Sequence, residues 1–301
     1  MKSPKPLKKG DTIGIISTAR KISPEEIAPA VALLESWGLY VRLGDHLFDE
    51  YHQFAGTTEA RAEDLQEMMD DDSVQAILCA RGGYGTVQII DLIDFSKFIQ
   101  NPKWIAGYSD VTVLHSHCHV HGVETIHSTM PINFPPDGSS NESTESLRKA
   151  LFGEPLLYEF NLGENSRDGI AERIIVGGNL SILYSLMGSK SSINTDGKIL
   201  FIEDLDEYLY HIDRMMMNLK RNNMIRNLRG LLVGGFSDMK DNTVPYGFDS
   251  TDIISSYVDH RTKMPVWFGF PAGHIGSNFA IILGRKVRIE IKNGVGKFSQ
   301  I

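Results

Sequence analysis

The chain has 301 residues, a formal net charge of −8 and 42% hydrophobic residues, which are values typical of a soluble globular protein. The negative charge argues against nucleic acid or an anionic membrane as the main partner, and no apolar run is long enough to span a bilayer. No signal-peptide core follows the N-terminal lysines, and Cys79 and Cys118 lack metal-ligand spacing. We therefore expect a cytoplasmic protein with reduced thiols and room for two domains.

Strand-like and helix-like segments alternate through the first 130 residues. Apolar runs predict strands at residues 12–17, 40–43, 74–80, 104–106 and 123–127, and helices are predicted at 23–38, 58–69, 86–93 and 110–121. A capping box at Ser23 supports the first helix. This alternation predicts a parallel sheet covered on both faces, with a ligand crevice beyond the carboxyl ends of its strands. Ser17, Ser109 and residues 81–85 fall at those ends.

The second half of the chain has a different character. We expect a first domain over residues 1–134, a linker over 135–169 with one short helix at 142–152, and a second domain over 170–301. The second domain is predicted to contain strands at 174–176, 198–202, 231–233 and 265–268, a turn at 177–179, helices at 180–187 and 206–222, and antiparallel strands at 280–283, 287–291 and 296–298. The fold class is therefore α/β: a parallel α/β domain of the Rossmann or flavodoxin type, followed by a mixed β/α domain with a strand-rich tail.

Ser109 stands between the apolar strand at Trp104 and the next helix, with no residues left over for a loop. Its hydroxyl would be held at the rim of the sheet, beside the first free N–H groups of the helix. A nucleophile benefits from this position, because its reaction generates negative charge one bond away. The alternative is that Ser109 only caps the helix, which is the commoner use of serine there.

Two residues from the second half supply the groups that a nucleophilic serine needs. Glu203 ends an apolar strand and His274 lies in a glycine-bounded loop. Each alone is more often structural, but together they provide an orienting acid and a general base in the order Ser, Glu, His. The sequence around Ser109 lacks the second glycine of G-x-S-x-G, which argues against the ordinary α/β-hydrolase elbow.

Two other patterns have competing interpretations. The glycine-rich turn at 81–85 could cradle a phosphate, offer the N–H of Gly83 to an oxyanion, or be a tight turn without a ligand. The alternating histidines at 115, 117, 119 and 121 suggest a metal site, but no carboxylate nearby completes one. We interpret them as a solvated or partly packed helix face.

Five motifs together resemble the L,D-carboxypeptidase family of serine peptidases, which includes the microcin-immunity peptidases. They are Gly107-Tyr108-Ser109-Asp110-Val111-Thr112, Arg81-Gly82-Gly83-Tyr84-Gly85, Gly177-Gly178-Asn179-Leu180, Phe201-Ile202-Glu203-Asp204 with Asp213-Arg214-Met215, and Gly269-Phe270-Pro271-Ala272-Gly273-His274. The match runs over nearly the whole chain in the right order. One departure is Ser17-Thr18-Ala19, where family members often have a Pro-Ser-Ser-type turn, so the resemblance assigns no contact to this loop.

The resemblance implies a role for each motif. Ser109 is the nucleophile, His274 the base and Glu203 its orienter, and the backbone N–H groups of Gly83 and Asp110 form the oxyanion hole. The substrate contacts that it implies are Arg81, Tyr84 and Asn179.

The family also implies an activity. It is removal of the terminal D-alanine from the L-centre of muropeptide tetrapeptides during cytoplasmic cell-wall recycling, without metal or organic cofactor, and with a homodimer as the assembly. A rival is a microcin-immunity-type peptidase or amidase that acts on a peptide-nucleotide. A third hypothesis is a two-domain small-molecule binder without catalysis.

Overall fold

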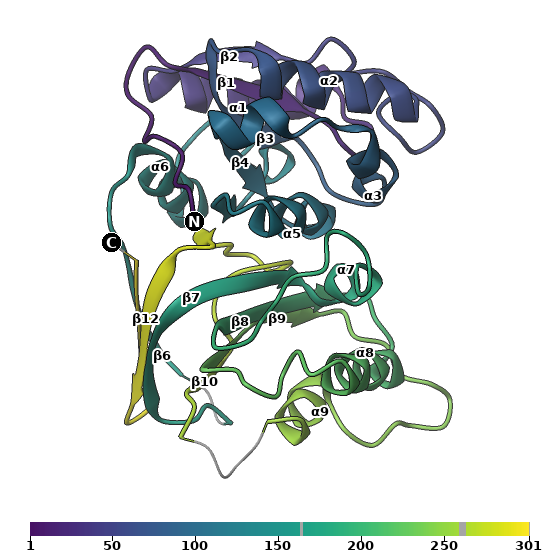
Figure 1. Ribbon diagram of the computed structural model, residues 1–301, viewed down its shortest axis with the longest axis vertical. Helices are drawn as coiled ribbons and strands as arrows, with labels where there is room; N and C mark the ends of the chain where they lie inside the picture. The colour runs from purple at the N-terminus through teal and green to yellow at the C-terminus, as the bar shows by residue number, and fades with distance from the viewer. Residues whose placement is uncertain (163–164, 259–262, 301) are drawn as a thin grey trace.

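The computed structural model describes residues 1–162, 165–258 and 263–300, which form two sheets stacked one above the other (Figure 1). The first sheet has the order β11-β5-β4-β3-β1-β2, and its strands β1 to β5 are parallel. Their bounds are Thr12–Ile16 for β1, Tyr40–Leu43 for β2, Val74–Cys79 for β3, Trp104–Gly107 for β4 and Thr125–His127 for β5. The predicted parallel sheet and the α/β fold class are confirmed.

The two long helices α1 and α2 of the first half begin at side-chain caps that the sequence provides. Ser23 closes a capping box at the start of α1, and Thr57 accepts a hydrogen bond from Ala60 N–H at the start of α2. The helices and 3₁₀ turns are α1 (Pro24–Ser36), α2 (Thr58–Asp70), α3 (Thr86–Ile89), η1 (Ile90–Leu92), α4 (Ser96–Gln100), η2 (Ser109–Val111), α5 (Thr112–Val120), η3 (Pro131–Asn133) and α6 (Glu142–Phe152).

The second sheet is mixed and has the order β10-β9-β8-β7-β12-β13-β6. Strands β7 to β10 are parallel, whereas β12, β13 and β6 extend the sheet antiparallel. The strands are β6 (Leu156–Asn161), β7 (Gly169–Asn179), β8 (Ile199–Leu205), β9 (Gly230–Ser237), β10 (Val266–Phe268), β12 (Lys286–Lys292) and β13 (Val295–Gln300). The helices α7 (Leu180–Ser185), α8 (Leu209–Arg221) and α9 (Ser250–Ser256) lie together on one side of this sheet (Figure 1).

Three predictions about the second half need correction. Residues 135–169, predicted as a linker, include not only the helix α6 but also β6, an edge strand of the second sheet. Residues 177–179, predicted as a turn, continue β7, because they pair in parallel with residues 201–203 of β8. The strand β11 (Ile281–Leu283), predicted in the tail of the second domain, pairs with β5 in the first sheet.

The core is continuous between the two sheets because side chains of each strand alternate between its faces. On β8, Ile199 and Phe201 join the cluster that contains Trp104 of the first sheet, whereas Leu200 and Ile202 join the cluster under α8. A further cluster lies on the other face of the first sheet, beneath α2 and α5. The two units therefore share one buried layer. Among the described residues, we find no helix with the length and apolar character needed to cross a bilayer.

Candidate active site

Ser109 is held at a sharp turn between β4 and α5. The strand ends at Gly107, whose φ of +154° and close approach to Val111 leave no room for a side chain. Ser109 itself has φ of +64°, a left-handed conformation that costs a non-glycine residue about 1–2 kcal/mol. The 3₁₀ turn η2 and then α5 begin at once. The predicted strand–turn–helix around Ser109 is present, and it lacks a loop as predicted.

Glu203 and His274 lie in direct contact. Glu203 is on the carboxyl end of β8 and fully buried, and His274 lies in the loop after β10. Nδ1 of His274 is 2.6 Å from Oε2 of Glu203, and the backbone N–H of His274 donates to the same oxygen at 3.2 Å. Burial lowers the pKa of His274, but the hydrogen bond and charge of Glu203 outweigh it, so this pKa is raised. The contact orients the ring through Nδ1 and leaves Nε2 available to exchange a proton.

The loop that carries His274 is fixed from two sides. Gly273 has φ of +107°, and a Cβ there would lie 2.6 Å from Oε2 of Glu203, so only glycine allows this approach. Its N–H donates to Oδ1 of Asn278 at 2.9 Å. On the other side, the ring of Tyr108 packs against His274 with centroids 4.7 Å apart, and its hydroxyl donates to Asn133 at 3.1 Å. Sequence reasoning did not single out Tyr108, although it directly precedes Ser109.

The glycine-rich turn after β3 packs against Ser109. A Cβ on Gly82 would lie 2.8 Å from Cβ and 2.9 Å from Oγ of Ser109. The next residue, Gly83, has φ of +121°, and a Cβ there would meet the side chain of Arg20 at 2.6 Å. The backbone of this turn therefore lies between Ser109 on one side and Arg20 on the other. Arg20 follows the carboxyl end of β1, so the rule that located Ser109 also points to its loop.

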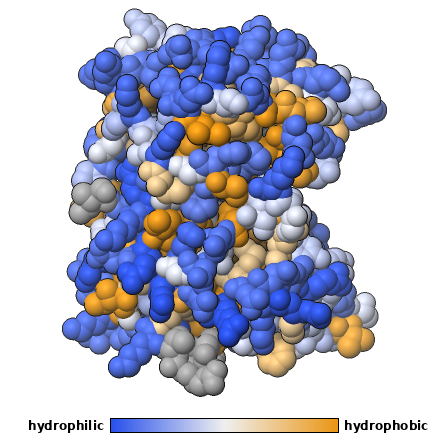
Figure 2. Space-filling model, in the orientation of Figure 1, coloured by the Kyte–Doolittle hydropathy of each residue, from blue (hydrophilic) through white to orange (hydrophobic). Residues whose placement is uncertain are grey.

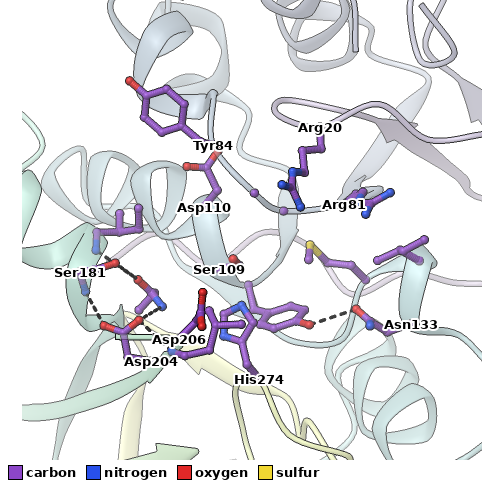
Figure 3. Close-up of a pocket in the computed structure, with 18 of the residues that line it drawn as sticks. Arg20, Arg81, Tyr84, Ser109, Asp110, Asn133, Ser181, Asp204, Asp206 and His274 are labelled. Atoms are coloured by element: carbon purple, nitrogen blue, oxygen red, sulfur yellow. Dashed lines mark hydrogen bonds between the residues drawn. The ribbon is translucent and has the colours of Figure 1, made fainter. Parts of the chain in front are cut away.

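A cavity of about 560 Å³ brings these groups together between the two sheets. Figure 2 shows the molecule hollowed on the side where α3 and α7 lie. The first half contributes Arg20, Arg81 to Tyr84 and Tyr108 to Asp110 to the lining, and the second contributes Asn179, Ser181, Asp204 to Glu207 and His274 (Figure 3). Ser109 and His274 thus share one cavity, and Glu203 lies buried behind the histidine.

Each predicted substrate contact lines this cavity, but the three differ in how free their side chains are. Arg81 donates to the carbonyl of Lys21 at 3.3 Å and lies 3.8 Å from Glu26. Tyr84 is half exposed and points away from Ser109 in Figure 3. The amide of Asn179 caps α7 through Ile182 N–H and donates to Asp204 at 3.0 Å. Their contact with a substrate stays a prediction.

Asp204 and Asp110 are buried carboxyls that directly follow Glu203 and Ser109 in the chain. Burial, and next the charge of Glu203, raise the pKa of Asp204 to about 7. Its oxygens accept from Asn179 and from the N–H of Ser181. Asp110 accepts from the N–H of Thr86 at 2.8 Å, which ties the residue after Ser109 to the start of α3. Both carboxyls therefore anchor backbone that forms the cavity wall.

The histidine run is packed more deeply than a solvated helix face. His115 is buried and bridges the carbonyl of Gly107 and the hydroxyl of Thr125, each at 2.9 Å, and burial lowers its pKa to about 4. His117 is also buried and contacts Ser191 at 2.8 Å. The solvated alternative is thus wrong for these two residues. Within the described part of the chain, no group of three or more His, Cys, Asp or Glu side chains is placed to hold a metal ion. Both thiols are free and buried.

Comparison with known proteins gives the class and then the family. The model described as the LD-carboxypeptidase N-terminal domain matches residues 13–128, and that of the LD-carboxypeptidase C-terminal domain matches residues 172–289. The protein is a hydrolase, a serine-type carboxypeptidase. It belongs to the LD-carboxypeptidase family, and the resemblance inferred from the five motifs is confirmed.

Three known proteins illustrate the match. The chain is 37% identical over 294 residues to the probable murein peptide carboxypeptidase of Bacillus subtilis. The alignment covers 95% of this chain and 91% of that protein. The muramoyltetrapeptide carboxypeptidase of Oxalobacter formigenes has a similar structure, with a TM-score of 0.85, 24% identity, and coverage of 96% of this chain and 98% of that one. MccF in complex with glutamyl sulfamoyl guanosine superposes with a TM-score of 0.86 at 22% identity, covering 99% and 98% of the two chains. These two structural matches show the same fold.

Proposed function

We propose that Ser109, His274 and Glu203 act as a catalytic triad. The observation that carries the proposal is the contact of 2.6 Å between Nδ1 of His274 and Oε2 of the buried Glu203. His274 lines the same cavity as Ser109, whose backbone is strained. Oγ of Ser109 attacks the amide carbonyl while Nε2 of His274 takes its proton and passes it to the leaving amine. Water then hydrolyses the acyl-enzyme with His274 again as base. Glu203 holds the ring and stabilises the imidazolium form.

The backbone N–H groups of Gly83 and Asp110 are proposed to stabilise the oxyanion. Asp110 follows the nucleophile directly, and Gly83 belongs to the turn that packs on Ser109. This pairing of the residue after the nucleophile with an N–H from a neighbouring loop is the arrangement used by hydrolases with a nucleophile at a strand–helix turn. The positive φ at Gly83 turns the backbone of that residue in a way that an L side chain would oppose.

The proposed substrate is a muropeptide tetrapeptide, from which the enzyme releases the terminal D-alanine at the L-centre of the diamino acid. The support is the relative from Bacillus subtilis, named a probable murein peptide carboxypeptidase, and the same fold in a muramoyltetrapeptide carboxypeptidase. The proposal includes a cytoplasmic recycling role and a homodimer, as the family resemblance implies. Light scattering on the purified protein measures the second of these directly.

The decisive experiment measures D-alanine release from the tetrapeptide. Wild-type protein should release D-alanine and spare the same peptide ending in L-alanine, because fixed oxyanion donors and a fixed nucleophile accept only one placement of the leaving residue. A misplacement of about 1 Å costs roughly a hundredfold in rate. Ser109→Ala should remain folded and lose at least about a thousandfold in kcat. Equal cleavage of both peptides would refute the L,D specificity, and a tenth of wild-type activity in the variant would refute the triad.

A second candidate substrate is a peptide-nucleotide of the microcin type, which the fold of MccF favours. The same triad would cleave its amide bond, so the two candidates differ only in what fills the cavity. Competition distinguishes them: the tetrapeptide and an aminoacyl sulfamoyl nucleoside are offered together, and kcat/KM is compared. A preference for the nucleoside would replace the muropeptide as the proposed substrate.

A further inference from the structure

A carboxypeptidase must recognise the free carboxylate of the residue that it removes. We propose that the Arg20 guanidinium binds this terminal carboxylate and so restricts cleavage to the last peptide bond. The inference rests on the proposed function and adds the recognition element that the sequence did not assign. It also gives the loop after β1 a role.

The position of Arg20 follows from the packing of the glycine turn. Gly82 contacts the nucleophile, since a Cβ on it would lie 2.9 Å from Oγ of Ser109. Gly83, the next residue, contacts Arg20, since a Cβ on it would lie 2.6 Å from Cγ, 2.7 Å from Cδ and 3.3 Å from Nε. The side chain of Arg20 therefore packs against Gly83, the residue whose N–H is proposed to bind the oxyanion. In Figure 3 its guanidinium extends toward Ser109, whereas Arg81 extends to the side.

This position matches the covalent structure of the substrate. Only the amide nitrogen and one Cα separate the scissile carbonyl from the terminal carboxylate, so the two groups lie within about 4 Å of each other. The cation that binds the carboxylate must therefore lie beside the oxyanion hole. Arginine suits this task because its planar guanidinium binds a carboxylate with two parallel hydrogen bonds.

The charges around the cavity leave Arg20 as the best available cation. Among the described residues, its guanidinium forms no ion pair with a carboxylate. Arg81, the other arginine of the lining, already donates to a backbone carbonyl and lies near Glu26. The described lining from the second half holds no lysine or arginine, and its acidic side chains include Asp206, which pairs with Lys240 at 2.7 Å, and Glu207, which contacts His211 at 2.5 Å. The terminal carboxylate is thus directed toward the first half of the chain, where Arg20 lies.

The backbone of Arg20 is fixed although its side chain is exposed. Its carbonyl accepts a hydrogen bond from the hydroxyl of Ser17 at 2.5 Å, and the backbone of Arg20 forms an antiparallel β-bridge with that of Phe54. The neighbouring Lys21 N–H donates to the carbonyl of Gln53 at 3.0 Å. These contacts hold the base of the side chain in place before a ligand arrives, which reduces the entropy lost on binding.

The test pairs two substrates with three variants. The substrates are the tetrapeptide ending in free D-alanine and the same peptide ending in neutral D-alaninamide. The variants are Arg20→Ala, Arg20→Lys and the control Lys21→Ala. Lys21 is a cation of the same loop whose side chain pairs with Glu50 and does not line the cavity. The readout is kcat/KM for each combination, together with the rate at which a neutral fluorophosphonate labels Ser109.

We expect wild type to prefer the acid over the amide by about a hundredfold, the value of a good hydrogen bond to a charged group. Arg20→Ala should lose this preference by cleaving the acid about a hundredfold more slowly and the amide within about threefold of wild type, with labelling of Ser109 unchanged. Arg20→Lys should fall between them, because it keeps the charge but loses the fork. Lys21→Ala should match wild type.

Two results would overturn the inference alone. In one, Arg20→Ala slows acid and amide equally or slows labelling of Ser109, which would make Arg20 a structural support of the glycine turn. In the other, the variant keeps the full preference for the acid. If wild-type protein releases no D-alanine from the tetrapeptide, the proposed function itself fails and the inference fails with it.

Discussion

A single methyl group placed on the glycine turn should disable Ser109, the proposed nucleophile. A Cβ on Gly82 would lie 2.8 Å from Cβ and 2.9 Å from Oγ of Ser109, whereas carbon atoms in ordinary contact are about 3.5 Å apart or more. Gly82→Ala must therefore displace Ser109 or the turn by more than about 0.5 Å. Gly82 does not have a positive φ, so the effect is steric and involves no forbidden backbone conformation.

The expected loss follows from that displacement. Because an error of about 1 Å at the reacting centre costs roughly a hundredfold, we expect kcat/KM for D-alanine release to fall between about ten- and a hundredfold. Overpacking should lower the free energy of unfolding by about 1–3 kcal/mol, which leaves the protein folded at room temperature. The matched control is Gly276→Ala, where a Cβ has no heavy atom within 4 Å and should change neither quantity. A folded Gly82→Ala protein with wild-type activity would refute the proposed packing of the turn on Ser109.

The remaining predictions concern the proposed triad and the histidine run. Glu203→Gln should lower kcat by about 10⁴. It should also shift the acid limb of the kcat/KM profile to lower pH, because neutral His274 is the proposed active form and the variant removes the charge that raises the pKa of His274, while burial still lowers this pKa. An unshifted limb would contradict this. Ser109→Gly should be inactive yet about 0.5–1 kcal/mol more stable to urea than Ser109→Ala, because glycine accepts φ of +64°; equal stabilities would exclude strain. His121→Gln, an exposed change, should leave activity within about threefold, and EDTA should have no effect.

The first sheet could be predicted from sequence because its signals are local. Buried parallel strands appear as short apolar runs, and caps such as the box at Ser23 mark where helices begin. The residues that could do chemistry stood at the carboxyl ends of these strands. The pairing of Glu203 with His274 is not local, since 71 residues separate them. The sequence joined them only through their roles and the chain order Ser, Glu, His, and the resemblance to a family supported that assignment before the structure did.

The errors arose where distant pairing decides local structure. Two glycines and an asparagine resemble a turn, yet residues 177–179 form strand because β8 lies alongside and accepts them in register. The role of β6 depends on β13, more than a hundred residues later. His115 was interpreted as part of a solvated or partly packed helix face, but α5 packs on the first sheet and also contacts β7 and α7, so its buried face needs polar partners there. The strand-end rule points to the loop of Arg20, but nothing in the sequence distinguished this arginine from any other loop arginine.

The pairing of β11 with β5 has a consequence for how the protein is made. Residues 125–127 emerge from the ribosome more than 150 residues before their partner at 281–283. At about 5–20 residues per second, the edge of the first sheet stays open for roughly 8–30 seconds. An unpaired strand edge is a template for association with other chains, and all three residues of β5 are buried once the protein has folded. The last tenth of the sequence therefore closes the first half of the molecule, and a nascent chain arrested before residue 281 would expose this edge to its neighbours on the polysome.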